Sequence, residues 1–412
     1  MEAIVQRILV KWRTVAVTIL AIKLAIVFMS TPAGDFINWA GVANVALGFV
    51  SRGRIPPVSV AGVYTYMGVV LVPFFWLWTL LPINHPSLTY ANYLGSYSTP
   101  AFFLNLFLKT PLFIADMGAG LLVMKLVRTM TGSETKDRLA FLAWFANPFN
   151  IYWINIDGAV DVIPTAIVLL AIYLALKDRS FLSGLSLAIG GILRIFPFLT
   201  FPFLLCSPRD RNVRSITYLL LGFLLVPIIA LTALYVSKAG SLEALALIPS
   251  GSYGGGGQPW LLDFLGTSSF NFDKYAPPVA GPDVKSAIVT LILQLLVCVR
   301  FWKKPTGPHL VTASILALFI GSLAYAGDPR HFMWVSPLLT VSLAINPNEV
   351  WVFLLTFVSA FGVTYPFGPS TPLLGTFLGG IFFGAEAIYL LKINQENIQI
   401  NAVDSRPVSL RT

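Results

Sequence analysis

One acidic residue, Asp35, is the strongest candidate for a catalytic base in this sequence. It precedes residues 36–49, a stretch containing Trp39 that predicts an amphipathic helix at the outer surface of a membrane. Arg52 and Arg54 follow this stretch. A carboxylate at the boundary between membrane and water can accept a proton from a hydroxyl group while arginines hold an anionic leaving group. We therefore predict that Asp35 is a general base.

The remaining candidates are ionisable residues inside apolar segments, where each costs a few kcal/mol and is a functional hypothesis by default. They are Lys109, Asp116, Asp157, Asp161 and Arg194, with Asp328, Arg330 and His331 grouped further along the chain. Lys109 and Asp116 lie two helical turns apart on one face, so a structural pair that holds helices together is an equally good interpretation. Asp157 either has a function or caps a helix. Lys23 is expected to face a neighbouring helix or to extend toward the interface, and Glu386 to be structural.

The elements that must position these residues are membrane helices. Only 11% of the 412 residues are charged, against roughly 25% in soluble domains. Five long stretches lack Asp, Glu, Lys and Arg altogether, namely residues 55–108, 139–156, 215–237, 305–327 and 350–385. We predict an all-α polytopic membrane protein and exclude soluble enzymes, nucleic-acid binders, coiled coils and disordered regulators for the whole chain. A β-barrel is disfavoured because the apolar stretches do not alternate with a period of two.

About twelve spans, between ten and fourteen, follow from the apolar segments. The segments are residues 14–30, 58–81, 99–127, 139–153, 160–176, 181–205, 215–236, 286–302, 310–326, 332–345, 350–365 and 373–391. Arg7, Lys11 and Arg13 indicate a signal anchor with the N-terminus inside. In the segment 181–205, Arg194 and Pro197 predict two short helices that meet at a break. The topology between residues 58 and 127 stays open.

The cysteine content, the histidine positions and the net charge exclude several kinds of site and partner. Cys206 and Cys298 are the only two cysteines, which excludes a disulfide framework and a multi-cysteine metal site. The three histidines are scattered along the chain. The net charge of +9 comes from short basic clusters between apolar segments, which is typical of cytoplasmic loops and argues against a nucleic-acid partner.

Several short motifs resemble one family when they are taken in order. They are Gly34-Asp35-Phe36, Tyr64-Thr65-Tyr66 ahead of Pro73, Lys109-Thr110-Pro111 with Asp116, Trp144 to Pro148, Asn155 to Gly158 with Asp161, Arg194-Ile195-Phe196-Pro197, and Arg330 to Trp334. Together they are similar to motifs of the C-type (GT-C) glycosyltransferases. The closer similarity is to the GPI mannosyltransferase I catalytic subunit and to prokaryotic polyprenol-phosphate-mannose-dependent mannosyltransferases. The resemblance covers roughly residues 30–340.

This resemblance implies a fold and a reaction. The fold would be a GT-C-like bundle with an amphipathic helix in the first outer loop. Residues 1–393 would form a single glycosyltransferase domain, with outer loops 31–57 and 238–283 over the active site, and residues 394–412 a cytoplasmic tail. The reaction would be an inverting transfer of a hexose, expected to be mannose, from a dolichyl-type polyprenyl phosphate to a glycan or lipid-linked acceptor, as a step in glycan biosynthesis.

Site roles follow from combining this reaction with the residues. Asp35 would take the acceptor proton, and three basic residues would hold the donor phosphate: Arg194, Arg330 and His331. Lys109, Asp116, Asp157, Asp161, Tyr64 and Tyr66 would give polar support, and Gln258 and Trp260 would contact the acceptor. The expected partners are the donor lipid, the acceptor, membrane lipids and a small accessory subunit, with no nucleic acid.

The sequence also leads to expectations about cofactors, cellular location and alternative functions. Related enzymes carry two acids in the first outer loop, but only Asp35 is present here, so we expect no metal ligands and leave a requirement for Mg²⁺ or Mn²⁺ open. The expected location is the plasma membrane, with the active site facing outside. Broken helices and charges at mid-membrane depth also fit a secondary transporter or lipid flippase. A structural membrane scaffold explains the hydrophobicity but assigns no role to Asp35 and Arg194.

Overall fold

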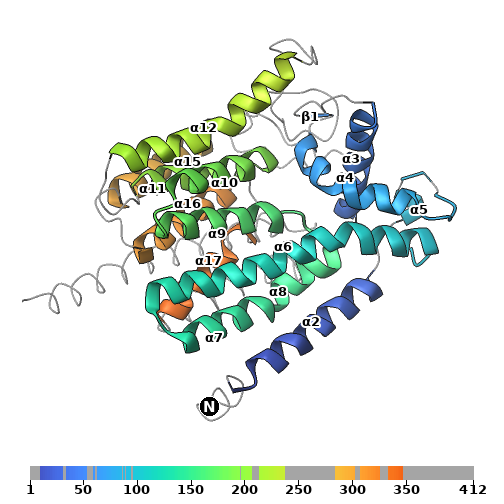
Figure 1. Ribbon diagram of the computed structural model, residues 1–412, viewed down its shortest axis with the longest axis horizontal. Helices are drawn as coiled ribbons and strands as arrows, with labels where there is room; N and C mark the ends of the chain where they lie inside the picture. Colours follow the sequence, from blue (N-terminus) through green and yellow to red (C-terminus); the bar gives the residue numbers. More distant parts are fainter. Residues whose placement is uncertain are drawn as a thin grey trace, which may run out of the picture. The chain divides into compact units, whose positions relative to one another are not determined.

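The computed structural model describes residues 10–30, 34–52, 59–60, 63–85, 87–88, 90–93, 96–194, 196–206, 213–236, 284–301, 307–324 and 333–346. The chain divides into two compact units, Met1–Ile345 and Asn346–Thr412. Of the second unit, only Asn346 belongs to the described residues. The first unit is built almost entirely from helices (Figure 1), which agrees with the prediction of an all-α chain.

The first half of this unit contains two long helices and several shorter elements. The helices are α2 (Trp12–Met29), α3 (Gly34–Val50), α4 (Thr65–Thr79), α5 (Tyr90–Tyr93), α6 (Thr99–Thr131), α7 (Glu134–Phe145) and α8 (Pro148–Asn150). A two-residue hairpin precedes α4, with β1 (Ser59–Val60) antiparallel to β2 (Val63–Tyr64). The described parts of residues 58–127, which the sequence left open, are therefore this hairpin followed by α4, α5 and most of α6.

The second half begins with an irregular segment. The elements are the π-helix η1 (Ile151–Asp157), α9 (Val162–Leu176), α10 (Ser180–Leu193), the 3-10 helix η2 (Phe196–Thr200), α11 (Phe201–Cys206), α12 (Val213–Val236), α15 (Val284–Phe301), α16 (Gly307–Ala324) and α17 (Ser336–Ile345). The predicted break at Arg194 and Pro197 is confirmed, because α10 ends at Leu193 and η2 begins at Phe196.

Two of the described helices, α2 and α6, are long and apolar enough to cross a membrane. Nine further apolar helical stretches in the described part of the chain have 10 to 17 residues. These helices agree with the membrane prediction, but they do not establish a bundle of twelve spans. The last two predicted spans, residues 350–365 and 373–391, lie outside the described residues.

Helix α6 is the longest described helix and the one around which the candidate site is built. Its 33 residues correspond to about 50 Å of helix, and it contacts α2, α4, α7, α9, α17 and η1. Figure 1 shows α7 and α9 running alongside it. The helix begins after Ser98 and ends at Gly132, whose φ of 67° provides a left-handed C-cap.

Helices α10 and α12 pack with their backbones in close contact. An added Cβ at Gly184 in α10 would lie 2.1 Å from the carbonyl oxygen of Leu219, and one at Gly222 in α12 would lie 2.0 Å from that of Phe181. Each glycine therefore faces the backbone of the other helix, as small residues do in packed membrane helices. This contact holds α10 in place, and α10 leads directly into the break at Arg194.

Candidate functional site

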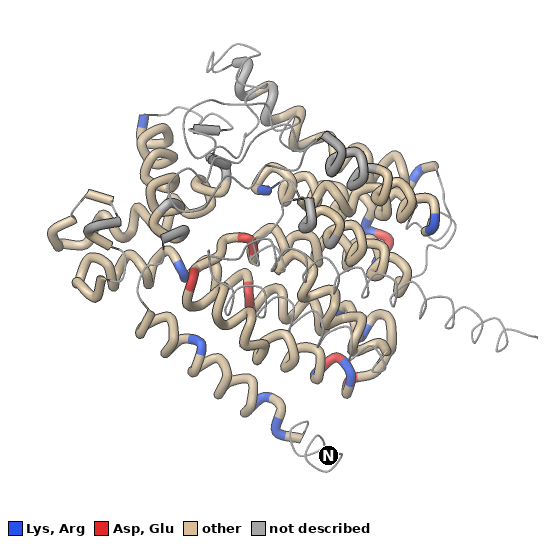
Figure 2. Tube along the Cα trace, turned by 180° about the vertical axis from the view of Figure 1, so that it is seen from behind, with Lys and Arg blue, Asp and Glu red and all other residues tan. Residues whose placement is uncertain are grey.

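Charged residues are sparse along the described helices, and a few of them lie in mid-helix (Figure 2). One of them is Lys109 of α6, which is 1% exposed. Its Nζ donates to three oxygens, namely Ser30 Oγ at 2.9 Å, the Asn155 carbonyl at 3.0 Å and the Ile156 carbonyl at 2.7 Å. The ammonium group also lies 5.4 Å from the centre of the Phe36 ring. Lys109 therefore joins α6, the end of α2 and η1.

The π-helix η1 explains why carbonyl groups are available to Lys109. The last carbonyls of a helix have no partner within the helix, and a π-helical turn marks functional or strained segments in many proteins. η1 ends at Gly158, where φ is 83°. A Cβ at Gly158 would lie 2.7 Å from Phe36 and 3.3 Å from Lys109 Cε, so glycine is required here both by its backbone conformation and by its neighbours.

A second cation lies at the break after α10. Arg194 Nε is 2.6 Å from Asp161 Oδ1, and its guanidinium lies 5.4 Å from the centre of the Trp39 ring. Asp161 is the N-cap residue of α9, although its side chain makes no capping hydrogen bond. Its carboxylate faces the arginine of the neighbouring helix instead.

Both cations meet the start of α3. Phe36 and Trp39 are one turn apart on this helix and both are buried, and they contact Lys109 and Arg194 respectively. We call Lys109, Asp161, Arg194 and these two aromatic residues the α3 cluster. Asp35 is the second residue of α3, directly before Phe36, but its side chain is outside the described part. Residues 36–49 are helical, as predicted, and belong to α3, while the expected place of this helix at the outer membrane surface stays a prediction.

A separate ion pair lies further along α6. Lys23 of α2 and Asp116 of α6 are both fully buried, with Nζ and Oδ2 2.5 Å apart. The indole of Trp144 donates to Asp116 Oδ1 at 3.0 Å, and Lys23 lies 4.2 Å from the centre of the Phe145 ring. The interpretation of Lys109 and Asp116 as a pair is wrong, because Asp116 binds Lys23 and Lys109 binds carbonyl and hydroxyl oxygens.

Two buried asparagines lie beside Lys109. Asn105 Nδ2 donates to the carbonyls of Val27 and Ser30 at 3.0 and 2.9 Å and to Ser30 Oγ at 3.1 Å. Its Oδ1, and both side-chain polar atoms of Asn155, are buried without a hydrogen-bond partner. Such atoms are costly in a native structure unless water or a ligand satisfies them. Sequence reasoning assigned no role to either side chain, although Asn155 is part of a quoted motif, because asparagine carries no charge that stands out in an apolar segment.

Other predicted site residues cannot be placed in the site. Arg330, His331, Gln258 and Trp260 lie outside the described residues. Tyr64 is in β2 and Tyr66 is in α4, and only their backbone is described. Asp157 ends η1 and α9 begins only at Val162, so the alternative that Asp157 caps a helix start is wrong, and a functional role for it stays a prediction. Within the described part of the chain, no group of three His, Cys, Asp or Glu residues could hold a metal ion.

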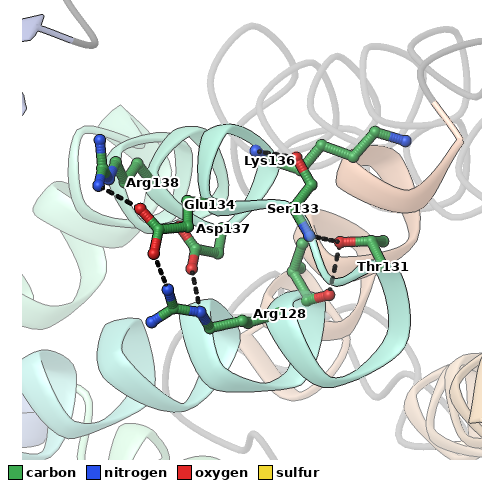
Figure 3. A network of polar contacts seen from close by, with 8 residues as sticks. Arg128, Thr131, Ser133, Glu134, Lys136, Asp137 and Arg138 are labelled. Atoms are coloured by element: carbon green, nitrogen blue, oxygen red, sulfur yellow. Dashed lines mark hydrogen bonds and ion pairs between the residues drawn. The ribbon is translucent and has the colours of Figure 1, made fainter.

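A polar network lies at the turn between α6 and α7, at the C-terminal end of α6 (Figure 3). Arg128 binds both Glu134 and Asp137, and Glu134 also binds Arg138. The Ser133 hydroxyl caps α7 by accepting from the backbone N–H of Lys136 at 3.3 Å.

Lys136 connects this network to α17. Its Nζ donates to the carbonyl of Ile345 at 3.2 Å. Because Ile345 is the last residue of α17, a cation here also interacts favourably with the negative end of that helix.

The site is thus a set of buried charges among apolar helices, each charge held by groups from a different helix. The profile of one protein family, described as GPI transamidase subunit PIG-U, matches residues 60–246. This match covers a little under half of the chain and runs from the hairpin through α12. Among curated proteins, none matches the sequence significantly.

The family match corrects the predicted function. A GPI transamidase subunit is not the catalytic subunit of a mannosyltransferase, so the predicted kinship with polyprenyl-phosphate-dependent glycosyltransferases is wrong. The predicted transfer of mannose from dolichyl phosphate mannose, and the classification as a glycosyltransferase in glycan biosynthesis, fail for the same reason. The donor lipid and its acceptor gain no support as partners, and neither does a plasma-membrane location with an outward-facing site.

The contacts of Arg194 give a physical reason for part of this error. Its positive charge and its place at a broken helix suit a phosphate ligand, which is what the sequence suggested. In the structure, Asp161 already accepts from its Nε, and Trp39 lies against its guanidinium. An arginine engaged in this way can also serve to join helices, and the sequence does not distinguish the two roles.

Proposed function

We propose that this chain is a membrane-embedded subunit of a multi-subunit assembly of the GPI transamidase kind, and that it acts there as a scaffold. The observation that carries the proposal is the match of residues 60–246 to the family of GPI transamidase subunit PIG-U. The matched range includes Lys109, Asp116, Asp161 and Arg194. The buried charge network therefore falls largely within the part of the chain that resembles a subunit of a complex.

The geometry of the network supports a scaffolding role. Lys23 binds Asp116, and Arg194 binds Asp161, while Lys109 is satisfied by three oxygens of the same unit. Breaking a buried pair by removing one partner costs about 3–5 kcal/mol, because the other charge stays buried. The first pair holds α2 against α6, and the second joins the end of α10 to the start of α9. A scaffold needs such fixed positions to present a constant surface to its partners.

The α3 cluster is the part of the network that we assign to assembly. It joins the start of α3 to α6 through Lys109 and to the break after α10 through Arg194. Residues far apart in sequence thereby fix one another, and the position of the start of α3 depends on both cations. Loss of the cluster should therefore weaken assembly more than loss of the same charge elsewhere.

The experiment is purification of the tagged chain from the membranes of its native host in a mild detergent. We expect the wild-type chain to elute as part of an assembly larger than its own 45.0 kDa, with other subunits identified by mass spectrometry. Lys109→Met with Arg194→Met should reduce co-purification of those subunits. Lys11→Gln with Arg13→Gln removes the same charge from exposed positions and should not.

Elution of the wild-type chain as a monomer, free of other subunits, would contradict the proposal. So would equal losses in the two double variants, because the α3 cluster would then have no particular role in assembly. A monodisperse elution profile for each variant controls for misfolding.

A further inference from the structure

Two exposed lysines that the buried network does not use share one tyrosine. Lys125 lies in the last two turns of α6, and Lys177 is the C-cap residue of α9. The Nζ of Lys125 is 5.8 Å from the centre of the Tyr173 ring, and that of Lys177 is 5.9 Å from it. Both lysines are exposed, whereas Tyr173 is half-buried between their helices. The pair forms a small basic surface with an aromatic floor, which we call the Tyr173 patch.

The charges around the Tyr173 patch leave it positive. Asp178 and Arg179 follow Lys177 directly and are also exposed, and their charges offset each other. Among the described residues, no carboxylate forms an ion pair with Lys125 or Lys177. Each lysine instead makes the cation–π contact with Tyr173, which is weak at an exposed site. The ammonium groups thus remain available to an anion.

The position of the patch on the helices points to a lipid surface. Helix α6 is long and apolar enough to span a membrane, and Lys125 lies near the end of it. Lysines at the ends of membrane helices and half-buried tyrosines are typical of the headgroup level. Met130, further along α6, and Leu176, directly before Lys177, both lie close to Gly307 at the start of α16. The patch therefore sits where three helices end together.

We propose that the Tyr173 patch binds the phosphate of an anionic lipid headgroup, with Lys125 and Lys177 as its two cationic contacts. Each lysine near an anionic membrane surface adds to the attraction for an anionic headgroup, and both lie within 6 Å of the centre of the same ring. This inference rests on the contacts of α6 and α9 and is independent of the proposed role in a transamidase-like assembly.

The test uses the full-length protein in detergent micelles and native mass spectrometry, with phosphatidylglycerol as the anionic probe and phosphatidylcholine as the zwitterionic one. We expect Lys125→Gln with Lys177→Gln to weaken phosphatidylglycerol binding by about tenfold or more and to leave phosphatidylcholine binding unchanged. Lys125→Arg with Lys177→Arg should retain binding, since the charges remain. Lys11→Gln with Arg13→Gln is the control for general loss of charge and should change binding by less than about threefold.

Three results would overturn the inference. The first is unchanged phosphatidylglycerol binding in the Gln variant, and the second is an equal loss in that variant and in the control. The third is competition by inorganic phosphate as effective as that by the lipid, which would mean that the patch binds free phosphate rather than a membrane lipid. A melting temperature within a few degrees of wild type confirms that the Gln variant is folded.

Discussion

Lys23 and Asp116 form a buried ion pair between two apolar helices. Its contribution to the free energy of unfolding can be measured separately from that of the surrounding packing. We predict that Lys23→Met and Asp116→Asn each destabilise the protein by about 3–5 kcal/mol, because each leaves the other charge buried and unpaired. The double variant should lose less than the sum of the two. A double-mutant cycle measured by unfolding in detergent tests this, and additive losses would show that the two residues do not stabilise each other.

Replacement by leucine should change the melting temperature in opposite directions at the two asparagines beside Lys109. Neither polar atom of the Asn155 side chain has a partner, so Asn155→Leu should raise the melting temperature by removing an unsatisfied amide of similar size. Asn105→Leu should lower it, because Nδ2 makes three hydrogen bonds. A lower melting temperature for Asn155→Leu would instead indicate that a water molecule or ligand satisfies this amide.

Aspartate 137 gives a pH dependence with a definite sign. Burial raises the pKa of Asp137 above its ordinary value, although the Arg128 guanidinium and, more weakly, Arg138 oppose this, while Glu134 adds to it. A raised pKa in the folded state means that the ionised form destabilises the fold at neutral pH, and that this penalty disappears as the pH falls below about 4.

The variant Asp137→Asn removes the titrating group. We expect it to be more stable than wild type at pH 7, with the difference in melting temperature shrinking as the pH is lowered. Melting curves at several pH values test this. A difference that grows toward low pH would mean that the pKa of Asp137 is lowered, not raised, in the folded protein.

Residue types in the network could be predicted from sequence, but their pairing could not. Lys109, Asp116, Asp161 and Arg194 stand out because each is charged within an apolar segment. Spacing along one helix identifies a shared face and says nothing of the partner helix. Lys23 and Asp116 are separated by 93 positions, and only the folded bundle brings them together.

At the scale of elements, the contact between α10 and α12 leaves no room for a side chain at Gly184 or Gly222. Gly184→Ala should destabilise the protein by about 1–3 kcal/mol, because the new methyl group meets the backbone carbonyl of Leu219. The matched control is Gly118→Ala in α6, where nothing lies within 4 Å of the added Cβ. That change should stabilise by up to about 1 kcal/mol through helix propensity. Equal effects of the two changes on the melting temperature would contradict this packing.

The elements themselves were predictable to different degrees. The break between α10 and η2 follows from Arg194 and Pro197, since proline and a charge rarely continue a membrane helix. The π-helix η1 does not follow from its sequence, because residues 151–154 are apolar and aromatic and resemble the continuation of a regular helix. What shapes η1 is tertiary: its last carbonyls bind Lys109, and Gly158 packs against Phe36.

At the scale of the whole molecule, composition predicted a helical membrane protein but motifs misled the prediction of function. Each motif that resembled a mannosyltransferase consists of a few aromatic, proline or charged residues, and such residues also arise wherever charged helices must pack in a membrane. The profile match spans residues 60–246 continuously, so it depends on many positions rather than on a few. A broken helix with an arginine is compatible with either role.

The central claim, a subunit of a transamidase-like assembly rather than a glycosyltransferase, is tested most directly by two activities measured in the same membranes. Membranes of the native host are prepared with the chain present, deleted and restored. We predict that deletion abolishes transfer of a precursor protein to an amine acceptor, that restoration recovers it, and that mannosyl transfer from polyprenyl-phosphate mannose is unchanged throughout. Loss of mannosyl transfer on deletion, with transamidation intact, would contradict the account.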